Sequence, residues 1–130
     1  MSAMTNYMEK ALTDHFFRNV PTTSPVTVYL AMYEDDPGED ASGTEASYTD
    51  YTREESTWSE ATDAGEIYNV GSIVFPANGG DSAVTFTHAA VFDAVNGGNM
   101  LIKGSLNVPK TIEPTDVIAV ADGQLKLTFD

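Results

Sequence analysis

The chain has 130 residues, of which 42% are hydrophobic and 20% are charged. Both fractions are typical of a single globular domain spanning 1–130. Its 20 acidic and 6 basic residues give a net charge of −14, which excludes nucleic acid and anionic membranes as favourable partners. The absence of cysteine excludes disulfides and zinc–thiolate sites, and no apolar run approaches the length of a membrane span. Residues 1–20 lack the basic and apolar regions of a secretory signal, so we expect none.

An amphipathic helix is predicted over about residues 3–18. Its apolar residues recur at helical spacing and form one stripe, made up of Met4, Tyr7, Met8, Ala11, Leu12 and Phe16. Asn6 and Glu9 have the spacing of a capping box, and Pro21 and Pro25 prevent the helix from continuing. We expect the stripe to pack on the protein's own sheet, and the alternative is docking onto a neighbouring subunit.

A strand is predicted over Val26 to Tyr33, because the side chains there alternate between two faces. The face that carries Tyr29 and Tyr33 is less polar than a solvent-exposed face should be. We therefore expect that face to be covered.

A long acidic loop is predicted over about residues 34–63, which hold 11 of the 20 acids. The loop has room for one short strand near its end. Its aromatic residues Tyr48, Tyr51 and Trp58 suit two roles equally: they could anchor an interface, or they could fasten the loop to its own domain.

The remainder is predicted to be a series of strands joined by turns. The expected strands are Glu66–Phe75, Ala83–Asp93, Met100–Val108, Asp116–Ala121 and Gln124–Phe129. Pro109–Thr115 is expected to be a turn or an edge, and Asp122-Gly123 has the signature of a two-residue hairpin turn. With no long helix between them, these strands predict a mainly β fold, an antiparallel β-sandwich or barrel with one N-terminal α-helix.

Catalytic and ligand-binding signatures are weak in this sequence. His15 lies on or beside the helical stripe and His88 lies in an apolar strand, so both are expected to be packing residues. The acids at 34–40 lack the spacing of an EF-hand loop, although bound calcium is left open. We expect no enzyme activity, no catalytic residues, no cofactor, no metal and no small-molecule substrate. A carbohydrate-active or metal-dependent enzyme is the disfavoured alternative.

The sequence resembles a family of small tailed-bacteriophage virion proteins, often labelled tail-fibre-like. The similar segments are Asn6–Leu12, Asp14-His15, Thr23–Tyr33, Asp36-Pro37, Gly43–Glu45, Ile73–Ala77, Val84–His88, Phe92–Ala94, Gly97–Leu101, Gly104–Leu106, Pro109–Ile112 and Gly123–Thr128. The resemblance weakens over Ala46–Glu55, where this chain has Tyr51-Thr52-Arg53 among acids. It implies a β-rich particle component without catalytic residues.

Two structural roles in the virion fit these observations. The first is a capsid cement or decoration protein that binds the major capsid protein, and the alternative is a tail fibre or tail-tip component. In either role we expect assembly in the host cytoplasm, binding to other virion proteins and homo-oligomer formation. The candidate interface residues are Tyr7, Phe16, Phe17, Tyr48, Tyr51 and Trp58.

Overall fold

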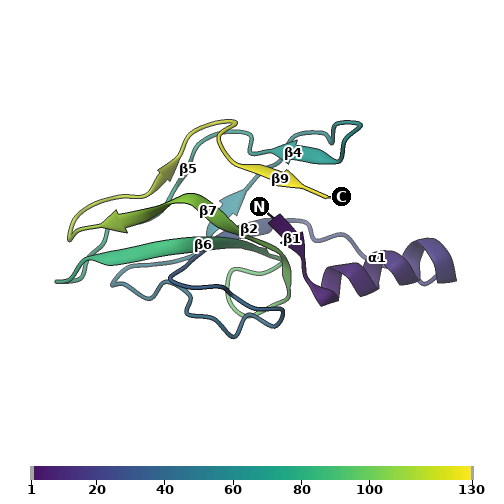
Figure 1. The fold of residues 1–130 in the computed structure, drawn as a ribbon, viewed down its shortest axis with the longest axis horizontal. Coiled ribbons are helices and arrows are strands. Elements are labelled where there is room, and N and C mark those ends of the chain that lie inside the picture. The colour runs from purple at the N-terminus through teal and green to yellow at the C-terminus, as the bar shows by residue number, and fades with distance from the viewer. Residues whose placement is uncertain (1, 130) are drawn as a thin grey trace.

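A computed structural model describes residues 2–129 as a mainly β protein with one N-terminal helix (Figure 1). The largest sheet has five antiparallel strands in the order β1-β7-β6-β2-β3, and two smaller antiparallel pairs are β4–β9 and β5–β8. The elements are β1 (Ser2–Met4), α1 (Asn6–Arg18), β2 (Val28–Tyr33), β3 (Glu54–Ser56), β4 (Glu66–Tyr68), β5 (Ile73–Val74), β6 (Val84–Phe92), β7 (Met100–Ile112), β8 (Ala119–Val120) and β9 (Lys126–Thr128). The predicted fold class is confirmed as a sandwich-like arrangement, and the sheet does not close into a barrel.

Both faces of the five-stranded sheet are covered, which explains the apolar character of β2 on each side. Leu30 and Met32 belong to the larger core, under the two small sheets. Ala31 and Tyr33 point to the opposite face, where they pack with Phe92 and with Ala41 of the acidic segment. In Figure 1 the small sheets lie above the large sheet, and the acidic segment lies below it. The expectation that the second face of β2 is covered is therefore confirmed.

The predicted single strand over Glu66–Phe75 is wrong, because the chain changes sheet in the middle of it. Asn69 is 1% exposed, and its amide nitrogen donates to the carbonyls of Gly71 (2.9 Å) and Ala121 (3.0 Å). Gly71 has a φ of 82°, a left-handed conformation that suits glycine. These two residues break the segment into β4 and β5, which pair with different partners.

Because β4 and β5 pair with different strands, the predicted hairpin at Asp122-Gly123 does not form. β8 pairs with β5 and β9 pairs with β4, so β8 and β9 do not pair with each other. The turn instead bonds to the β4–β5 connection, where the Gly71 amide donates to the Asp122 carboxylate (2.7 Å) and the Gly123 amide donates to the Asn69 carbonyl (2.9 Å).

Of the two positions expected for Pro109, a turn or an edge, the structure shows an edge, because this part of β7 pairs with β6 alone. β7 continues to Ile112, and its pairing with β6 jumps from Ser105 to Lys110 while β6 advances only from His88 to Phe86. The additional residues of β7 form an irregular bulge, a position that tolerates a proline because no ladder hydrogen bond is required there.

Candidate interaction surface

The start of α1 is fixed to the large sheet by one buried threonine. Thr5 is 0% exposed, and its hydroxyl oxygen accepts from the Met8 amide (3.3 Å) and donates to the Met100 carbonyl (2.5 Å). The Thr5 amide donates to the Leu101 carbonyl (3.0 Å), and the Asn6 amide donates to the Glu39 carboxylate (3.0 Å). The predicted capping box of Asn6 and Glu9 is wrong, since Thr5 is the N-cap and Asn6 is the first helical residue.

The far end of α1 is closed by local polar contacts. Asn19 adopts a left-handed conformation (φ 55°), and the Val20 amide donates to the Asp14 carbonyl (3.1 Å). Asp14 also forms ion pairs with Lys10 and with Arg18 (Nη1 to Oδ1, 2.9 Å). Hydrogen bonds from Lys10 and Arg18 lower the pKa of the Asp14 carboxyl. The left-handed Asn19 and these polar contacts define the end of the helix.

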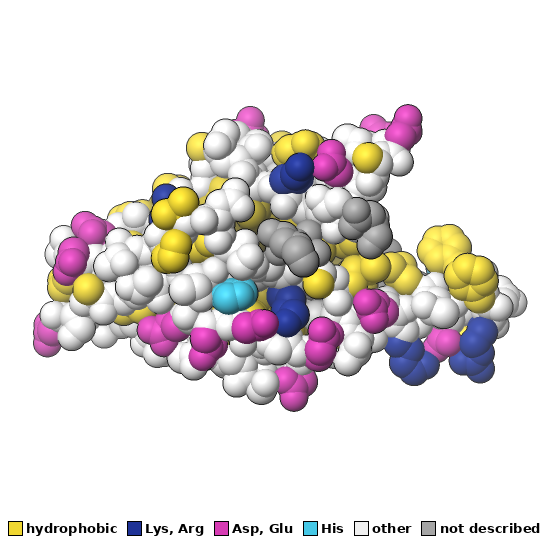
Figure 2. All heavy atoms as spheres, viewed as in Figure 1, with side chains coloured by type: hydrophobic (Ala, Val, Ile, Leu, Met, Phe, Trp, Pro, Cys, Tyr) yellow, Lys and Arg dark blue, Asp and Glu magenta, His cyan; other side chains and the backbone are white. Residues whose placement is uncertain are grey.

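The middle and end of α1 project away from the sheets (Figure 1). No residue of the helix is buried, and Tyr7, Phe16 and Phe17 are 47%, 74% and 84% exposed. Figure 2 shows hydrophobic side chains on one side of the projecting helix and charged side chains on the other. The expectation that the apolar stripe packs on the protein's own sheet holds only for its first part. Met8, Ala11 and Leu12 are half-buried near Leu101 of β7, whereas Phe16 is exposed. Docking of the exposed part of the stripe onto a neighbouring subunit stays a prediction.

The chain returns from α1 along an exposed segment that makes a groove with the helix. We refer to residues 5–27 as the N-terminal arm. The groove has a volume of about 360 Å³ and lies between Met8, Ala11 and Leu12 of α1 and the segment Thr22–Pro25. The arm also exposes Val20 and Val26, so it holds five of the ten large hydrophobic side chains that are exposed in residues 2–129. This concentration makes the arm the strongest candidate contact surface.

The acidic loop is fastened to the body by its aromatic residues and by Arg53. Tyr48 is buried, and its hydroxyl donates to the Pro76 carbonyl (2.7 Å). Tyr51 stacks on Phe75 with ring centroids 6.2 Å apart, and its hydroxyl donates to the Glu45 carboxylate (3.0 Å). Burial, together with the charge of Glu45, raises the pKa of the Tyr51 hydroxyl well above its usual value.

Trp58 is also attached to its own domain. Its indole nitrogen donates to the Ser56 hydroxyl (3.0 Å), its backbone pairs with Asn69, and its ring packs against the larger core. Of the two roles considered for the loop aromatics, the structure shows the intramolecular one for Tyr48, Tyr51 and Trp58. A further role of Trp58 at an interface stays a prediction.

Arg53 is a structural residue that the sequence analysis did not single out. Its guanidinium forms a two-bond ion pair with the Glu45 carboxylate (2.8 and 2.9 Å) and donates to the carbonyls of Ala94 and Gly97. It also lies 3.6 Å from the ring centre of Phe92. Burial alone would lower the pKa of Arg53, but the hydrogen bonds and charge of Glu45 outweigh it and raise the pKa. The sequence feature that could have predicted this role is a single arginine in a polar segment that is rich in acids.

The two histidines occupy separate, locally bonded positions. His15 Nδ1 lies 3.1 Å from the Val20 carbonyl oxygen, and His88 Nδ1 lies 2.8 Å from the Thr87 hydroxyl. Among the described residues, no group of three or more histidine or acidic side chains is placed to hold a metal ion. At the head of the acidic loop, Asp36 forms an ion pair with Lys103 (2.7 Å), and that hydrogen bond lowers the pKa of the Asp36 carboxyl.

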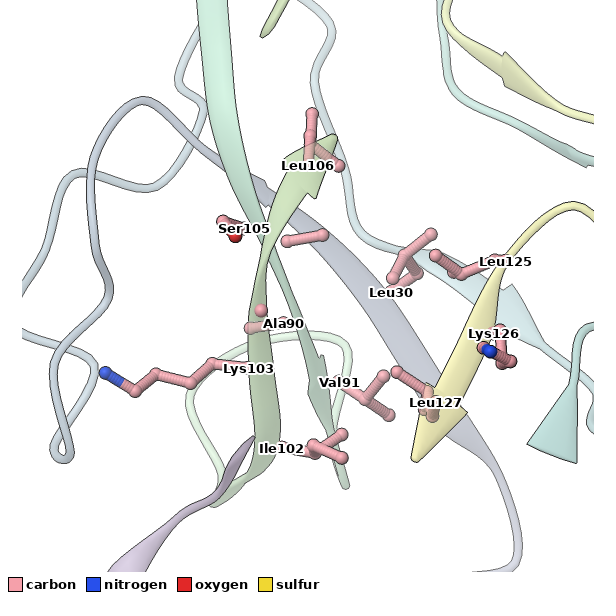
Figure 3. A pocket seen from close by; sticks show the side chains of 12 residues that line it. Leu30, Ala90, Val91, Ile102, Lys103, Ser105, Leu106, Leu125, Lys126 and Leu127 are labelled. Carbon is pink, nitrogen blue, oxygen red and sulfur yellow. The ribbon is translucent and has the colours of Figure 1, made fainter. Parts of the chain in front are cut away.

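An apolar cavity lies between the large sheet and β9 (Figure 3). Figure 3 shows Leu127 of β9, and Leu125 just before that strand, facing Leu30 and Val91 of the large sheet, while the Lys103 side chain points away. The cavity has a volume of about 60 Å³. Ligand pockets commonly measure about 300–1,000 Å³. The arrangement is therefore a small gap between two packed layers rather than a substrate pocket.

The family described as Podophage GP4 fiber I protein gp80 matches residues 3–128. The chain belongs to this family. The match includes the arm, both small sheets and the acidic loop, and it confirms the resemblance to small tailed-phage virion proteins. The protein is therefore a virion protein, and its family is a structural fibre family. No curated protein matches the chain. Within residues 2–129, no helix has the length and apolar character that crossing a bilayer requires.

Proposed function

We propose that this protein is a non-enzymatic structural component of a fibre in the virion of a tailed phage. The family match over residues 3–128 carries the proposal, because the matched family is named for a phage fibre protein. The exposed apolar arm supports it, since surfaces of this kind mark sites of protein–protein contact.

The arm is the proposed contact surface, with Tyr7, Phe16 and Phe17 as its anchors. Aromatic side chains of this exposure contribute strongly to binding when a partner buries them. The proposed partners are other virion proteins, including further copies of this chain. Tyr48, Tyr51 and Trp58 contribute indirectly, because they hold the acidic loop against the sheet.

A capsid cement or decoration protein bound to the major capsid protein is the second candidate. The surface favours this role only in that its strong negative charge would keep decorated particles apart in solution. The fibre role is preferred because the family name specifies a fibre.

Copy number separates the two roles. Quantitative gel densitometry of purified virions should find a small number of copies for a fibre component, and hundreds for a decoration protein. Gold-labelled antibodies against the chain should mark the tail region in electron micrographs. A uniform label over the capsid, together with a high copy number, would overturn the fibre role.

A further inference from the structure

The N-terminal arm contains a helix whose last turn, His15 to Arg18, is left exposed by the residues that the structure describes. An isolated helix of 13 residues is marginal in water, and helices in proteins are stabilised chiefly by packing of their apolar face. In α1, however, Phe16 and Phe17 remain 74% and 84% exposed. Because the arm is held at its root by Thr5 and Glu39, these rings are presented at a defined position.

The same arm borders a hollow, which the exposed Tyr7 helps to line. The groove of about 360 Å³ is lined by residues of α1, by the segment Thr22–Pro25, and by Asp93 and Leu101 of the body. The α1 residues are Tyr7, Met8, Ala11 and Leu12. The arm therefore carries both projecting aromatic side chains and an apolar recess. A surface with both features can be complementary to a second copy of itself.

Charge favours another copy of this chain as the occupant. The arm has two acids, Glu9 and Asp14, and two bases, Lys10 and Arg18, so its net charge is 2 − 2 = 0. The whole net charge of −14 therefore belongs to the rest of the chain. When two copies approach with their arms facing each other, the arms carry no net charge, and Asp93 is the one acid that the body adds to the groove lining. The acidic bodies point away from each other, and salt screens charges beyond about 8 Å at physiological ionic strength.

The size of the arm is adequate for such a contact. Standard protein interfaces use about 20–30 residues from each partner. The arm spans residues 5–27 and exposes five large hydrophobic side chains: Tyr7, Phe16, Phe17, Val20 and Val26.

We propose that two copies of the chain associate arm to arm about a two-fold axis, with Phe16 and Phe17 of each copy entering the groove of the other. In such an isologous contact, both copies use the same residues. The rings of each copy are buried in the groove of the other copy. The inference rests on the arm being the contact surface of the proposed function, and it adds the identity and geometry of the partner.

The first experiment measures the association of the purified full chain by sedimentation equilibrium. The wild-type chain should form a dimer, and F16S/F17S should weaken dimerisation by at least about 30-fold, as expected for aromatic anchors. The control V108S removes a valine that is 66% exposed outside the arm, and it should dimerise like the wild type. Circular dichroism should show the same fold for all three proteins.

The second experiment tests whether the rings of one copy enter the groove of the other. Ala11 lines the groove, so A11W should block it and also weaken dimerisation. Mixing A11W with F16S/F17S should produce mixed dimers, because the rings of the first variant can enter the open groove of the second. Native mass spectrometry distinguishes these mixed dimers from either homodimer.

Three outcomes would overturn the inference. A wild-type chain that stays monomeric at high concentration would exclude a second copy as the occupant. Association that continues beyond the dimer would exclude the two-fold contact. Dimers of F16S/F17S as tight as the wild type would exclude the arm. If wild-type monomers still enter virions and F16S/F17S monomers do not, the proposed function survives while this inference fails.

Discussion

Arg53 connects the acidic loop to another part of the chain through several contacts of a single side chain. It joins Glu45 of the loop to the Ala94 and Gly97 carbonyls in the β6–β7 connection, and it covers the Phe92 ring. A lysine could not reproduce these contacts, because an ammonium group lacks the planar fork that binds a carboxylate through two bonds.

Replacing Arg53 with alanine should lower the free energy of unfolding by about 3 kcal/mol. The loss arises because the Ala94 and Gly97 carbonyls would lose this donor, and the half-buried Glu45 carboxylate would lose its counter-ion and keep only the Tyr51 hydroxyl as a donor. Urea unfolding followed by tryptophan fluorescence measures it. The control K126A breaks the more exposed ion pair with Glu66, and it should lower the free energy by less than about 1 kcal/mol. Equal losses in the two variants would contradict this account of Arg53.

Buried tyrosines should make the protein sensitive to alkali. Burial raises the pKa of Tyr33 from 10.0 to about 12, so the folded state retains this proton while the unfolded state releases it. The stabilisation is complete below pH 10 and is lost as the pH rises from 10 toward 12. Unfolding free energies measured across this range should fall steadily. The unfolding free energy of Y33F should fall less steeply with pH. An identical slope in Y33F and the wild type would exclude Tyr33 as the cause.

At the scale of the elements, α1 depends on its first turn more than on its exposed face. Thr5 is buried and bonded to both the helix and β7, whereas Thr13 lies on the exposed helix and bonds only to the Glu9 carbonyl. The two threonines thus provide a matched pair on one element.

T5A should lower the free energy of unfolding by about 2 kcal/mol and reduce the helical circular dichroism signal. The Met8 amide and the Met100 carbonyl both lose the Thr5 hydroxyl. T13A should change the free energy by less than about 0.5 kcal/mol, as exposed substitutions usually do. If T13A proved as destabilising as T5A, the root of the arm would not be the determinant of helix stability.

The alternation of apolar and polar side chains, together with the turn residues, was sufficient to predict where most strands lie. It was not sufficient to predict which strands pair. The periodicity of Val26–Tyr33 and Ala83–Asp93 anticipated β2 and β6 to within about two residues. The pairing of β4 with β9 and of β5 with β8 could not be predicted, because it depends on the buried Asn69 bonding to segments about fifty residues away. The exposed arm was also mispredicted, since an amphipathic stripe has the same pattern whether its partner is the same chain or another.

The whole molecule is a strongly acidic body that carries a neutral arm. With a net charge of −14, self-repulsion within the folded body opposes its compact state. The described ion pairs involve few of the acids: Asp14, Glu45, Asp36 and Glu66.

Raising sodium chloride from about 0.01 to about 0.1 M should therefore increase the melting temperature by several degrees, because the screening length falls from about 30 to about 10 Å. Differential scanning calorimetry measures the change. Calcium chloride at equal ionic strength should give the same melting temperature if screening is the cause. A clearly higher value with calcium would instead indicate a bound cation in the acidic loop.

The attachment of the arm determines how a fibre subunit would carry tension. The arm leaves the body through β1, an edge strand with three paired residues, and returns through β2, which pairs with strands on both sides. The arm joins both strands at the same end of the sheet, so a pull on the arm would load them alike, and β1 would detach before β2 because fewer pairs hold it. Mechanical strength should therefore reside in β2. Because the chain contains no cysteine, a single thiol placed in the arm would offer a unique handle for pulling one molecule at a time.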